Sequence, residues 1–222
     1  MQKLLVLIGV FITMQSFGQT MPKQFVYLKD IDGSIQSELA YCSSNNFIGK
    51  RILGYLNDRV IVSKKTALAL QKIQAQLKKQ HYSLKIFDAY RPQQAVDHFV
   101  NWANDLQDTL MKAEYYPKIS KKNLFKQGFI ASKSGHTRGS TVDLTIIHLS
   151  TGKEMDMGSS YDFFGKESHP FYTKISLKQQ KNRLFLRNIM RANGFLPYDN
   201  EWWHFTLKNE PFPNTYFNFP VQ

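Results

Sequence analysis

Two short stretches of the sequence carry side chains that suit hydrolytic chemistry. The first, SGHTRGSTVDLTI, runs from residue 134 to residue 146 and places His136 in a glycine-flanked loop, seven residues before Asp143. The second, EWWHF, contains Glu201 and His204. Imidazole and carboxylate groups are both suitable ligands for Zn²⁺. A histidine and an aspartate alone are a weak signal, but the second stretch adds a third candidate ligand and a further carboxylate.

The position of Asp143 on an apolar strand is the main reason to expect a site. The apolar residues beside it alternate along the strand, so Asp143 points to the opposite face. A buried and unpaired carboxylate is strongly unfavourable. We therefore expect this face to meet either water or a polar site. Gly139 allows the intervening TRGS turn to bend sharply, which would bring His136 and Asp143 together.

Three protein ligands with an open fourth position characterise catalytic zinc sites. We interpret His136, Asp143 and His204 as candidate ligands, and Glu201 as a candidate general base for the attacking water. Residues three apart on a regular strand point to opposite faces. Glu201 and His204 can therefore act together only if Glu201 lies where the strand begins or on a bulge. The alternative is an edge strand with a solvent-exposed Glu201 and a packed His204.

The remaining histidines and the cysteine lack such acidic companions. We expect surface or capping roles for His81, His98, His148 and His169. Cys42 is the only cysteine, so an internal disulfide is excluded. A lone cysteine is more often a small buried residue than a nucleophile.

The length and composition predict one domain, and the first 18 residues predict its export. The chain has 222 residues, of which 42% are hydrophobic, enough for a single core. The apolar run Leu4–Met14 follows Lys3, is shorter than the ~20 residues that span a bilayer, and precedes the small residues of SFG. We expect residues 1–18 to be a cleaved signal peptide and residues 19–222 to form the mature periplasmic or secreted domain. The alternatives are a retained membrane anchor and a buried N-terminal helix.

The formal net charge of +12 favours polyanionic surroundings. The lysines are dispersed along the chain rather than clustered in a basic arm, which is typical of solvated faces. We therefore expect no nucleic-acid partner. We also expect no stable membrane insertion after signal cleavage, and the sequence leaves the oligomeric state open.

Hydrophobic periodicity predicts the elements that must position these residues. Three helices are expected: residues 66–80 with Thr66 as cap, a helix from Pro92 onward, and residues 177–195 with Gly194 at its end. The apolar residues at helical spacing in the first helix are Leu68, Leu70, Ile73 and Leu77. The expected inward residues are Ala95, Phe99, Trp102 and Leu106 in the second helix, and Leu184, Leu186, Ile189 and Met190 in the third.

Strands are expected at residues 82–90, at EWWHFTL and in two extended pieces on either side of the His136 loop, with short extended segments within residues 24–62. Helices and strands alternate without a βαβ repeat. This pattern predicts a single α+β domain with a mostly antiparallel sheet and flanking helices.

Three motifs in this order, DAYRP, SGHTRGSTVDLT and EWWHF, resemble the zinc D-alanyl-D-alanine dipeptidases, the VanX family. The resemblance covers about residues 28–222 and includes further stretches such as MGSSYDFFG and PFPNTYFNFP. It implies that His136, Asp143 and His204 hold one zinc ion. It also implies that Glu201 is the base that passes a proton to the leaving amine.

The resemblance assigns three further residues. Arg91, in DAYRP, matches the arginine that stabilises the oxyanion, a role that suits a fixed guanidinium. The alternative for Arg91 is a structural salt bridge with Asp88. Ser134 and Asp162 match positions that hold the free ammonium group of the substrate, which would select dipeptides over longer chains.

The implied reaction is zinc-dependent hydrolysis of the small dipeptide D-Ala-D-Ala to two D-alanines. The apparent export signal departs from the cytoplasmic resistance enzymes of this type and favours turnover or salvage of wall-derived dipeptide. Two alternatives stay open. One is a zinc D,D-carboxypeptidase or endopeptidase that acts on peptidoglycan stem peptides. The other is a non-catalytic, zinc-stabilised wall-binding module, which would need neither Glu201 nor Arg91.

Overall fold

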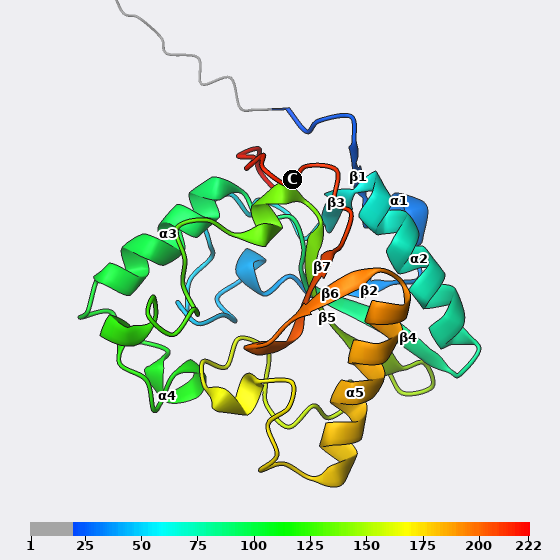
Figure 1. Ribbon diagram of the computed structural model, residues 1–222. Helices are drawn as coiled ribbons and strands as arrows, with labels where there is room; N and C mark the ends of the chain where they lie inside the picture. Colours follow the sequence, from blue (N-terminus) through cyan, green and yellow to red (C-terminus); the bar gives the residue numbers. More distant parts are fainter. Residues whose placement is uncertain (1–19) are drawn as a thin grey trace, which may run out of the picture.

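A five-stranded sheet forms the centre of the domain in the computed structural model, which describes residues 20–222 (Figure 1). The predicted signal peptide, residues 1–18, lies outside the described residues. The strand order is β2-β4-β5-β7-β6. These strands are β2 (Gln36–Ser37), β4 (Tyr82–Asp88), β5 (Thr141–His148), β6 (Phe195–Tyr198) and β7 (Glu201–Leu207).

The sheet is mixed rather than purely antiparallel. Strand β2 runs parallel to β4, whereas the β4–β5, β5–β7 and β6–β7 pairs are antiparallel. A separate two-stranded antiparallel sheet joins β1 (Phe25–Tyr27) to β3 (Ile61–Ser63). The prediction of one α+β domain with a mostly antiparallel sheet is confirmed, with one parallel pair at its β2 edge.

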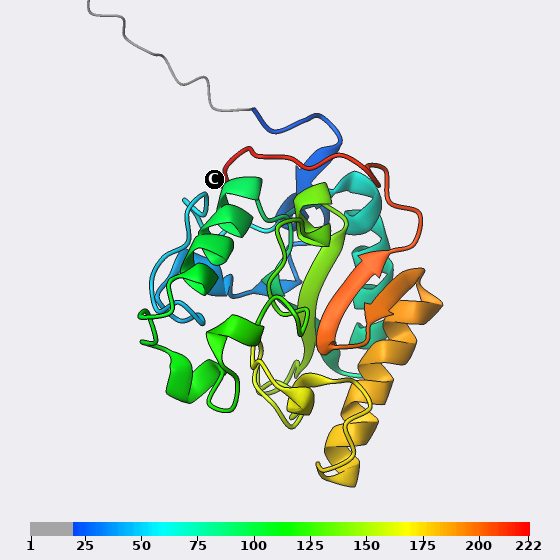
Figure 2. The same ribbon diagram turned by 60° about the vertical axis from the view of Figure 1, so that its left-hand side comes forward.

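Helices lie on both sides of this sheet. They are α1 (Leu28–Ile31), α2 (Lys64–Lys78), α3 (Gln93–Asn104), α4 (Lys112–Tyr115) and α5 (Leu177–Ala192). Helices α2 and α5 cover one face, and α3, α4 and long connecting loops lie on the other side (Figures 1 and 2). None of the helices within residues 20–222 combines the length and the apolar character that crossing a bilayer requires.

The predicted cap of α2 is wrong. The helix begins at Lys64, and its N-cap is Ser63, whose hydroxyl accepts a hydrogen bond from the backbone N–H of Thr66. Thr66 is buried inside the first turn, and its own hydroxyl lies 2.8 Å from that of Ser63. Both residues are good caps in isolation, so only the structure shows which one precedes the helix.

Three residues expected in the apolar patterns of the helices are exposed. Leu68 of α2 is 44% exposed. Leu106 lies beyond α3, which ends at Asn104, and is 43% exposed. Leu184 is 50% exposed, although Leu186 of the same helix is fully buried. Two residues turn a helix by about 200°, so the two leucines cannot share a face. The position that completes the inward face of α5 is occupied instead by Arg183, which is 2% exposed.

The stretch before His136 is also less regular than expected. Only one of the two predicted extended pieces is a strand, β5, and residues 128–134 form loops and bends. Short 3-10 turns occur in the connections, at Ala40–Cys42 (η1), Lys121–Asn123 (η2), Gly135–Arg138 (η3) and Lys166–Ser168 (η4). Turn η3 leads directly toward β5, so it fixes where His136 lies relative to that strand.

The bend between η3 and β5 depends on Gly139, as predicted. Gly139 ends η3 with φ of +79°, in the left-handed region that favours glycine. A Cβ atom at this position would also overlap the ring of Phe25. Two constraints therefore select glycine here, one from the backbone and one from packing.

We expect Gly139→Ala to lower the free energy of unfolding by about 2–5 kcal/mol, because left-handed backbone costs about 1–2 kcal/mol and overpacking adds about 1–3 kcal/mol. Gly152→Ala is the matched control, since Gly152 has φ of +68° and no atom within 4 Å of an added Cβ. Denaturant unfolding of both variants measures the difference. Equal losses would show that contact with Phe25 does not constrain the turn.

Candidate active site

The predicted site residues line one cavity of about 210 Å³ between the sheet and α3. His136 comes from η3, Asp143 from β5, and His204 from β7. Asp143 and His204 are direct cross-strand partners in the β5–β7 register. Sheet pairing therefore brings together two side chains that are 61 positions apart in the sequence, and the Gly139 turn adds the third.

Glu201 joins this group because of an irregularity in the sheet. It is the first residue of β7 and pairs with Tyr198, next to a register shift between Pro197 and Tyr198. Its carboxylate oxygen Oε2 lies 3.4 Å from Nδ1 of His204. The prediction that Glu201 lies at the start of the strand or at a bulge is confirmed.

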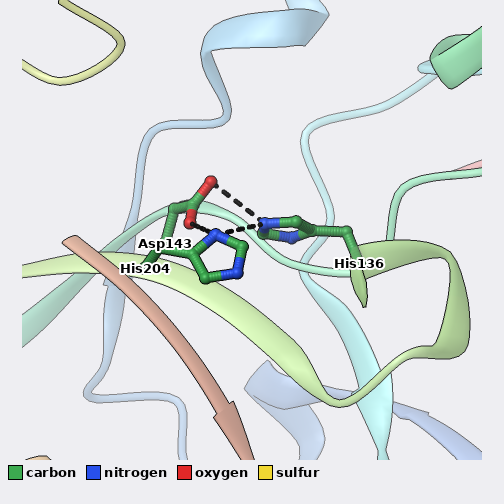
Figure 3. A group of neighbouring side chains, drawn as sticks. All are labelled: His136, Asp143 and His204. Atoms are coloured by element: carbon green, nitrogen blue, oxygen red, sulfur yellow. Dashed lines mark hydrogen bonds and ion pairs between the residues drawn. The ribbon is translucent and has the colours of Figure 1, made fainter. Parts of the chain in front are cut away.

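His136, Asp143 and His204 converge on one point (Figure 3). Nε2 of His136 lies 3.2 Å from Oδ2 of Asp143, and Nδ1 of His204 lies 3.1 Å from Oδ1 of Asp143. The two ring nitrogens are 3.3 Å apart. One ligand atom from each residue falls within 4.8 Å of the others, so the group could hold a metal ion.

The hydrogen-bond chemistry of this group fits a cation. Nδ1 of His136 lies 2.7 Å from the carbonyl oxygen of Ala89, so it carries the proton and Nε2 presents a lone pair. That lone pair faces Asp143, whose ionised carboxylate can only accept. Oδ1 of Asp143 is buried without a hydrogen-bond partner. Lone pairs that face one another need a positive charge between them, and two imidazoles with a carboxylate are a frequent ligand set for catalytic Zn²⁺.

Burial and mutual charge shift the ionisation of these groups in different directions. Burial alone would raise the pKa of Asp143, but His136 and His204 hold that pKa well below its ordinary value. Burial lowers the pKa of His136. Burial would also lower the pKa of His204, but Asp143 and Glu201 together raise it. Burial raises the pKa of Glu201 to about 7, a value suited to a group that accepts and returns a proton near neutral pH.

Arg91 lies at the end of the same cavity and makes the salt bridge that was considered as its alternative role. Its Nε and Nη2 atoms are each 2.9 Å from Oδ2 of Asp88, and Nη2 is 3.6 Å from Oδ2 of Asp143. The guanidinium lies about 5 Å from the ring centroids of Tyr41 and Phe99. Its other terminal nitrogen, Nη1, takes part in none of these ion pairs. A structural salt bridge and a position facing the substrate are therefore compatible.

Asp88 anchors this arrangement from beneath. It is fully buried, accepts a hydrogen bond of 2.6 Å from the hydroxyl of Tyr55, and lies 3.6 Å from Nδ1 of His136. Burial raises the pKa of Asp88, while Arg91 and His136 oppose that shift. Burial would lower the pKa of Arg91, but Tyr41 and Asp88 raise it well above its usual value, so the guanidinium stays charged.

Ser134 and Asp162 also line the cavity. The hydroxyl of Ser134 accepts a hydrogen bond from the backbone N–H of His136 and thereby caps η3. Asp162 is 6% exposed and accepts a hydrogen bond of 2.8 Å from the hydroxyl of Tyr41. Burial and the charge of Asp143 raise the pKa of Asp162 well above its ordinary value. An ammonium group beside Asp162 would favour its ionised form.

The loop that carries Asp162 is held by Arg183 of α5. Asp162 has φ of +57°, which is uncommon outside glycine and needs support from its surroundings. Arg183 donates hydrogen bonds to the backbone carbonyls of Met157, Glu167 and His169 and to the hydroxyl of Ser159. A polar residue in the inward face of α5 therefore has a specific function, which apolar periodicity could not reveal.

The remaining candidates lie outside the metal-binding group. His98 accepts a hydrogen bond from the backbone N–H of Leu53, and His81 ends the turn after α2 with φ of +61°. The thiol of Cys42 donates to the carbonyl oxygen of Asn57, and burial raises its pKa to about 12. These properties disfavour a nucleophilic role for Cys42, as predicted.

Several residues of the cavity were not identified from the sequence. Tyr41 binds the predicted Asp162 directly, and the apolar wall of the cavity is formed by Phe47, Val96, Phe99, Phe129 and Phe164. Tyr161, next to Asp162, approaches Asp143. Tyrosines are frequent in this chain, so the only sequence signal for Tyr161 is that it directly precedes Asp162.

Comparison with known proteins identifies similar chains. Residues 21–222 match the Peptidase M15 family, described as D-ala-D-ala dipeptidase. The chain is 42% identical over 201 residues to a D-alanyl-D-alanine dipeptidase of Enterococcus faecalis, which covers 90% of this chain and 100% of the relative. It is 40% identical over 201 residues to a D-alanyl-D-alanine dipeptidase of Streptomyces coelicolor, with the same coverage. A solved structure of the vancomycin resistance D,D-pentapeptidase VanY with Zn(II) has a TM-score of 0.43 and 13% identity, and covers 70% of this chain and 77% of that chain.

The buried pair beneath the site leads to a stability prediction. We expect Asp88→Ala to lower the free energy of unfolding by about 3–5 kcal/mol, because it leaves the charge of Arg91 buried without its partner. Asp108→Ala is the control, since its ion pair with Lys50 spans 3.9 Å and the lysine side chain is 66% exposed; such pairs contribute little. Chemical denaturation compares the two variants. A loss for Asp88→Ala no larger than for Asp108→Ala would contradict the anchoring role.

Proposed function

The chain belongs to the D-Ala-D-Ala dipeptidase family of peptidases, and from this premise we propose that it hydrolyses D-alanyl-D-alanine to two D-alanines. One observation carries the proposal for the site. His136, Asp143 and His204 converge on one point inside a small cavity, and Glu201 lies 3.4 Å from His204. A binding module would need neither a carboxylate beside the metal-binding group nor a charged arginine held at the cavity wall.

We propose that His136, Asp143 and His204 hold one Zn²⁺ ion per chain. The support is the ligand set and its geometry: both carboxylate oxygens of Asp143 lie within 3.2 Å of an imidazole nitrogen, which fits a cation held by three protein ligands. When bound, zinc supplies Lewis-acid chemistry, because it lowers the pKa of water and polarises a carbonyl group. The reaction otherwise depends on proton transfer and charge stabilisation by the side chains of the protein.

Glu201 and Arg91 are the proposed catalytic residues. Glu201 accepts the proton of the attacking water and delivers it to the nitrogen of the leaving D-alanine, and burial, which raises the pKa of its carboxyl group, favours the protonated form that makes this delivery. Arg91 presents a fixed positive charge to the oxygen that becomes negative as the peptide carbonyl turns tetrahedral. Asp88 holds the guanidinium of Arg91 in place, so the guanidinium does not have to reorient during the reaction.

Recognition of the substrate is assigned to the rest of the cavity. Asp162 and Ser134 receive the free ammonium group, and the aromatic wall accepts the methyl groups. Pockets for drug-sized ligands measure about 300–1,000 Å³, so a cavity of about 210 Å³ suits a smaller substrate. The small volume and the buried Asp162 favour the free dipeptide over the stem peptides that a D,D-carboxypeptidase would require.

We also propose that the protein is exported, with residues 1–18 as its signal peptide. The support is the short apolar run Leu4–Met14 after Lys3, followed by the small residues of SFG. An exported dipeptidase acts on dipeptide released from the wall rather than on the cytoplasmic precursor pool. Salvage or turnover of wall peptides is therefore the proposed role.

The proposed base and the proposed ligands respond differently to substitution. We expect Glu201→Gln to retain one zinc ion and to lose turnover by about 10²–10⁴-fold, since glutamine cannot accept the proton. His204→Ala should lose the zinc as well, because two ligands hold the ion poorly. Metal content and turnover are measured on the same preparations. A zinc-free Glu201→Gln protein would make Glu201 a ligand, and a fully active one would exclude it as the base.

Recognition of the ammonium group predicts a selectivity. The native protein should cleave D-Ala-D-Ala far better than its N-acetylated form, because acetylation removes the positive charge that pairs with Asp162. Asp162→Ala should reduce this preference by weakening cleavage of the free dipeptide. Rates on both substrates provide the measurement. Equal cleavage of the two by the native protein would favour the carboxypeptidase alternative.

Export predicts the mass of the mature chain. Protein recovered from the cell envelope should begin near Gln19, and intact-mass spectrometry measures this directly. A mass that still includes residues 1–18 would contradict cleavage and would favour a retained anchor or a cytoplasmic role.

A further inference from the structure

Two tyrosine hydroxyls lie between two buried carboxylates of the cavity, those of Asp162 and Asp143. The hydroxyl of Tyr41 donates to Oδ2 of Asp162 over 2.8 Å. The hydroxyl of Tyr161 lies 3.2 Å from that of Tyr41 and 3.2 Å from Oδ2 of Asp143. A chain of hydroxyl contacts therefore runs from Asp162, the proposed ammonium site, to Asp143, the proposed metal ligand.

The number of hydroxyl protons limits which of these hydrogen bonds can form at the same time. Each tyrosine hydroxyl has one proton to donate. Tyr41 gives its proton to Asp162, so Tyr161 can donate either to Asp143 or to the oxygen of Tyr41, but not to both. The choice depends on which acceptor is more negative, and hence on the charges of Asp143 and Asp162.

The two oxygens of Asp143 have different surroundings. Oδ2 lies 3.2 Å from the hydroxyl of Tyr161, 3.2 Å from Nε2 of His136 and 3.6 Å from Arg91, whereas Oδ1 lies 3.1 Å from Nδ1 of His204. A hydrogen bond from Tyr161 to Oδ2 would fix the direction in which the carboxylate meets a cation between the two imidazoles. The hydroxyl of Tyr161 thus contributes to the orientation of the proposed ligand.

The ring of Tyr161 is held independently of its hydroxyl. It stacks on Phe87 of β4 with ring centroids 4.7 Å apart, and it meets Trp203 of β7 edge-on at 5.4 Å. Phenylalanine would keep both ring contacts. The contact of this hydroxyl with Asp143 is therefore separate from the packing of the ring, and the substitution Tyr161→Phe removes the contact while keeping the packing.

We propose that Tyr161 is a positioning residue that fixes the metal-binding orientation of Asp143 and, through Tyr41, couples metal binding to the charge of Asp162. The coupling to substrate rests on the proposed function, in which Asp162 pairs with the ammonium group. The effect on metal binding rests only on the geometry of His136, Asp143 and His204. Because coupling between two sites is reciprocal, a change at Asp162 must alter the zinc affinity, and zinc must alter the affinity for the ammonium group.

The first experiment measures zinc affinity by competition with a chromophoric chelator. Loss of a group that orients a metal ligand typically costs about 10–100-fold in metal affinity, and we expect Tyr161→Phe to fall in this range. Tyr90→Phe is the matched control, because it removes another buried tyrosine hydroxyl, bonded over 2.9 Å to the carbonyl of Phe219, outside this chain of hydroxyl contacts. A zinc affinity for Tyr161→Phe within about twofold of the native and Tyr90→Phe proteins would overturn the positioning role.

The second experiment is a double-mutant cycle on the same readout. Asp162→Asn should change the zinc affinity of the native chain and should change it much less when Tyr161 is already phenylalanine. Direct electrostatic interaction between Asp162 and Asp143 does not need the hydroxyl of Tyr161. If Asp162→Asn changes the zinc affinity equally in the native and the Tyr161→Phe chains, the coupling does not pass through Tyr161 and the proposed link is overturned. No shift in the native background would overturn the coupling itself.

Activity separates this inference from the proposed function. If the native protein hydrolyses D-Ala-D-Ala, Tyr161→Phe assayed at saturating zinc should regain most of its kcat, while its preference for the free over the N-acetylated dipeptide should decrease. An unchanged preference would contradict the coupling to Asp162. If the native protein hydrolyses neither substrate, the proposed function fails, whereas the zinc affinities still decide the role of Tyr161.

Discussion

The structure depends on the convergence of electron-rich atoms at one buried point. Nε2 of His136, Nδ1 of His204 and the carboxylate of Asp143 lie within hydrogen-bonding distance of one another, although at least one of these contacts joins two acceptors. Such an arrangement is unfavourable unless a proton or a cation lies between the groups. The surrounding fold must therefore hold these side chains together against their mutual repulsion.

Three parts of the fold perform this task. The β5–β7 register places Asp143 opposite His204, and the left-handed backbone at Gly139 turns η3 so that His136 reaches the same point. Beneath them, the buried Asp88 binds Arg91 and supports the orientation of the cavity wall. Helices α2 and α5 cover the opposite face of the sheet, so the polar group lies on the face that meets α3 and its loops (Figure 2).

The sequence predicted those features of the site that depend on residues close together in the chain. A charged residue within an apolar strand marked Asp143, and the spacing of Glu201 and His204 required the irregular start of β7 that the structure contains. The sequence could not predict contacts made by distant segments. Tyr41 and Tyr161 reach the site from loops 120 residues apart, and no periodic pattern indicates that their hydroxyls meet. Helix α5 gives a second example, because Leu184 is exposed and Arg183 is buried in its place. Arg183 is buried because it donates hydrogen bonds to a distant loop, and apolar periodicity does not reveal such contacts.

We propose that this convergence is a zinc site with three protein ligands. The most direct measurement is a crystal structure of the purified chain with anomalous diffraction data recorded on both sides of the zinc absorption edge. We expect one anomalous peak per chain, bound by His136, Asp143 and His204 at about 2.0–2.2 Å, with Glu201 nearby but not bound to the metal. No peak in zinc-supplemented crystals, or a peak with Glu201 among its ligands, would contradict the account.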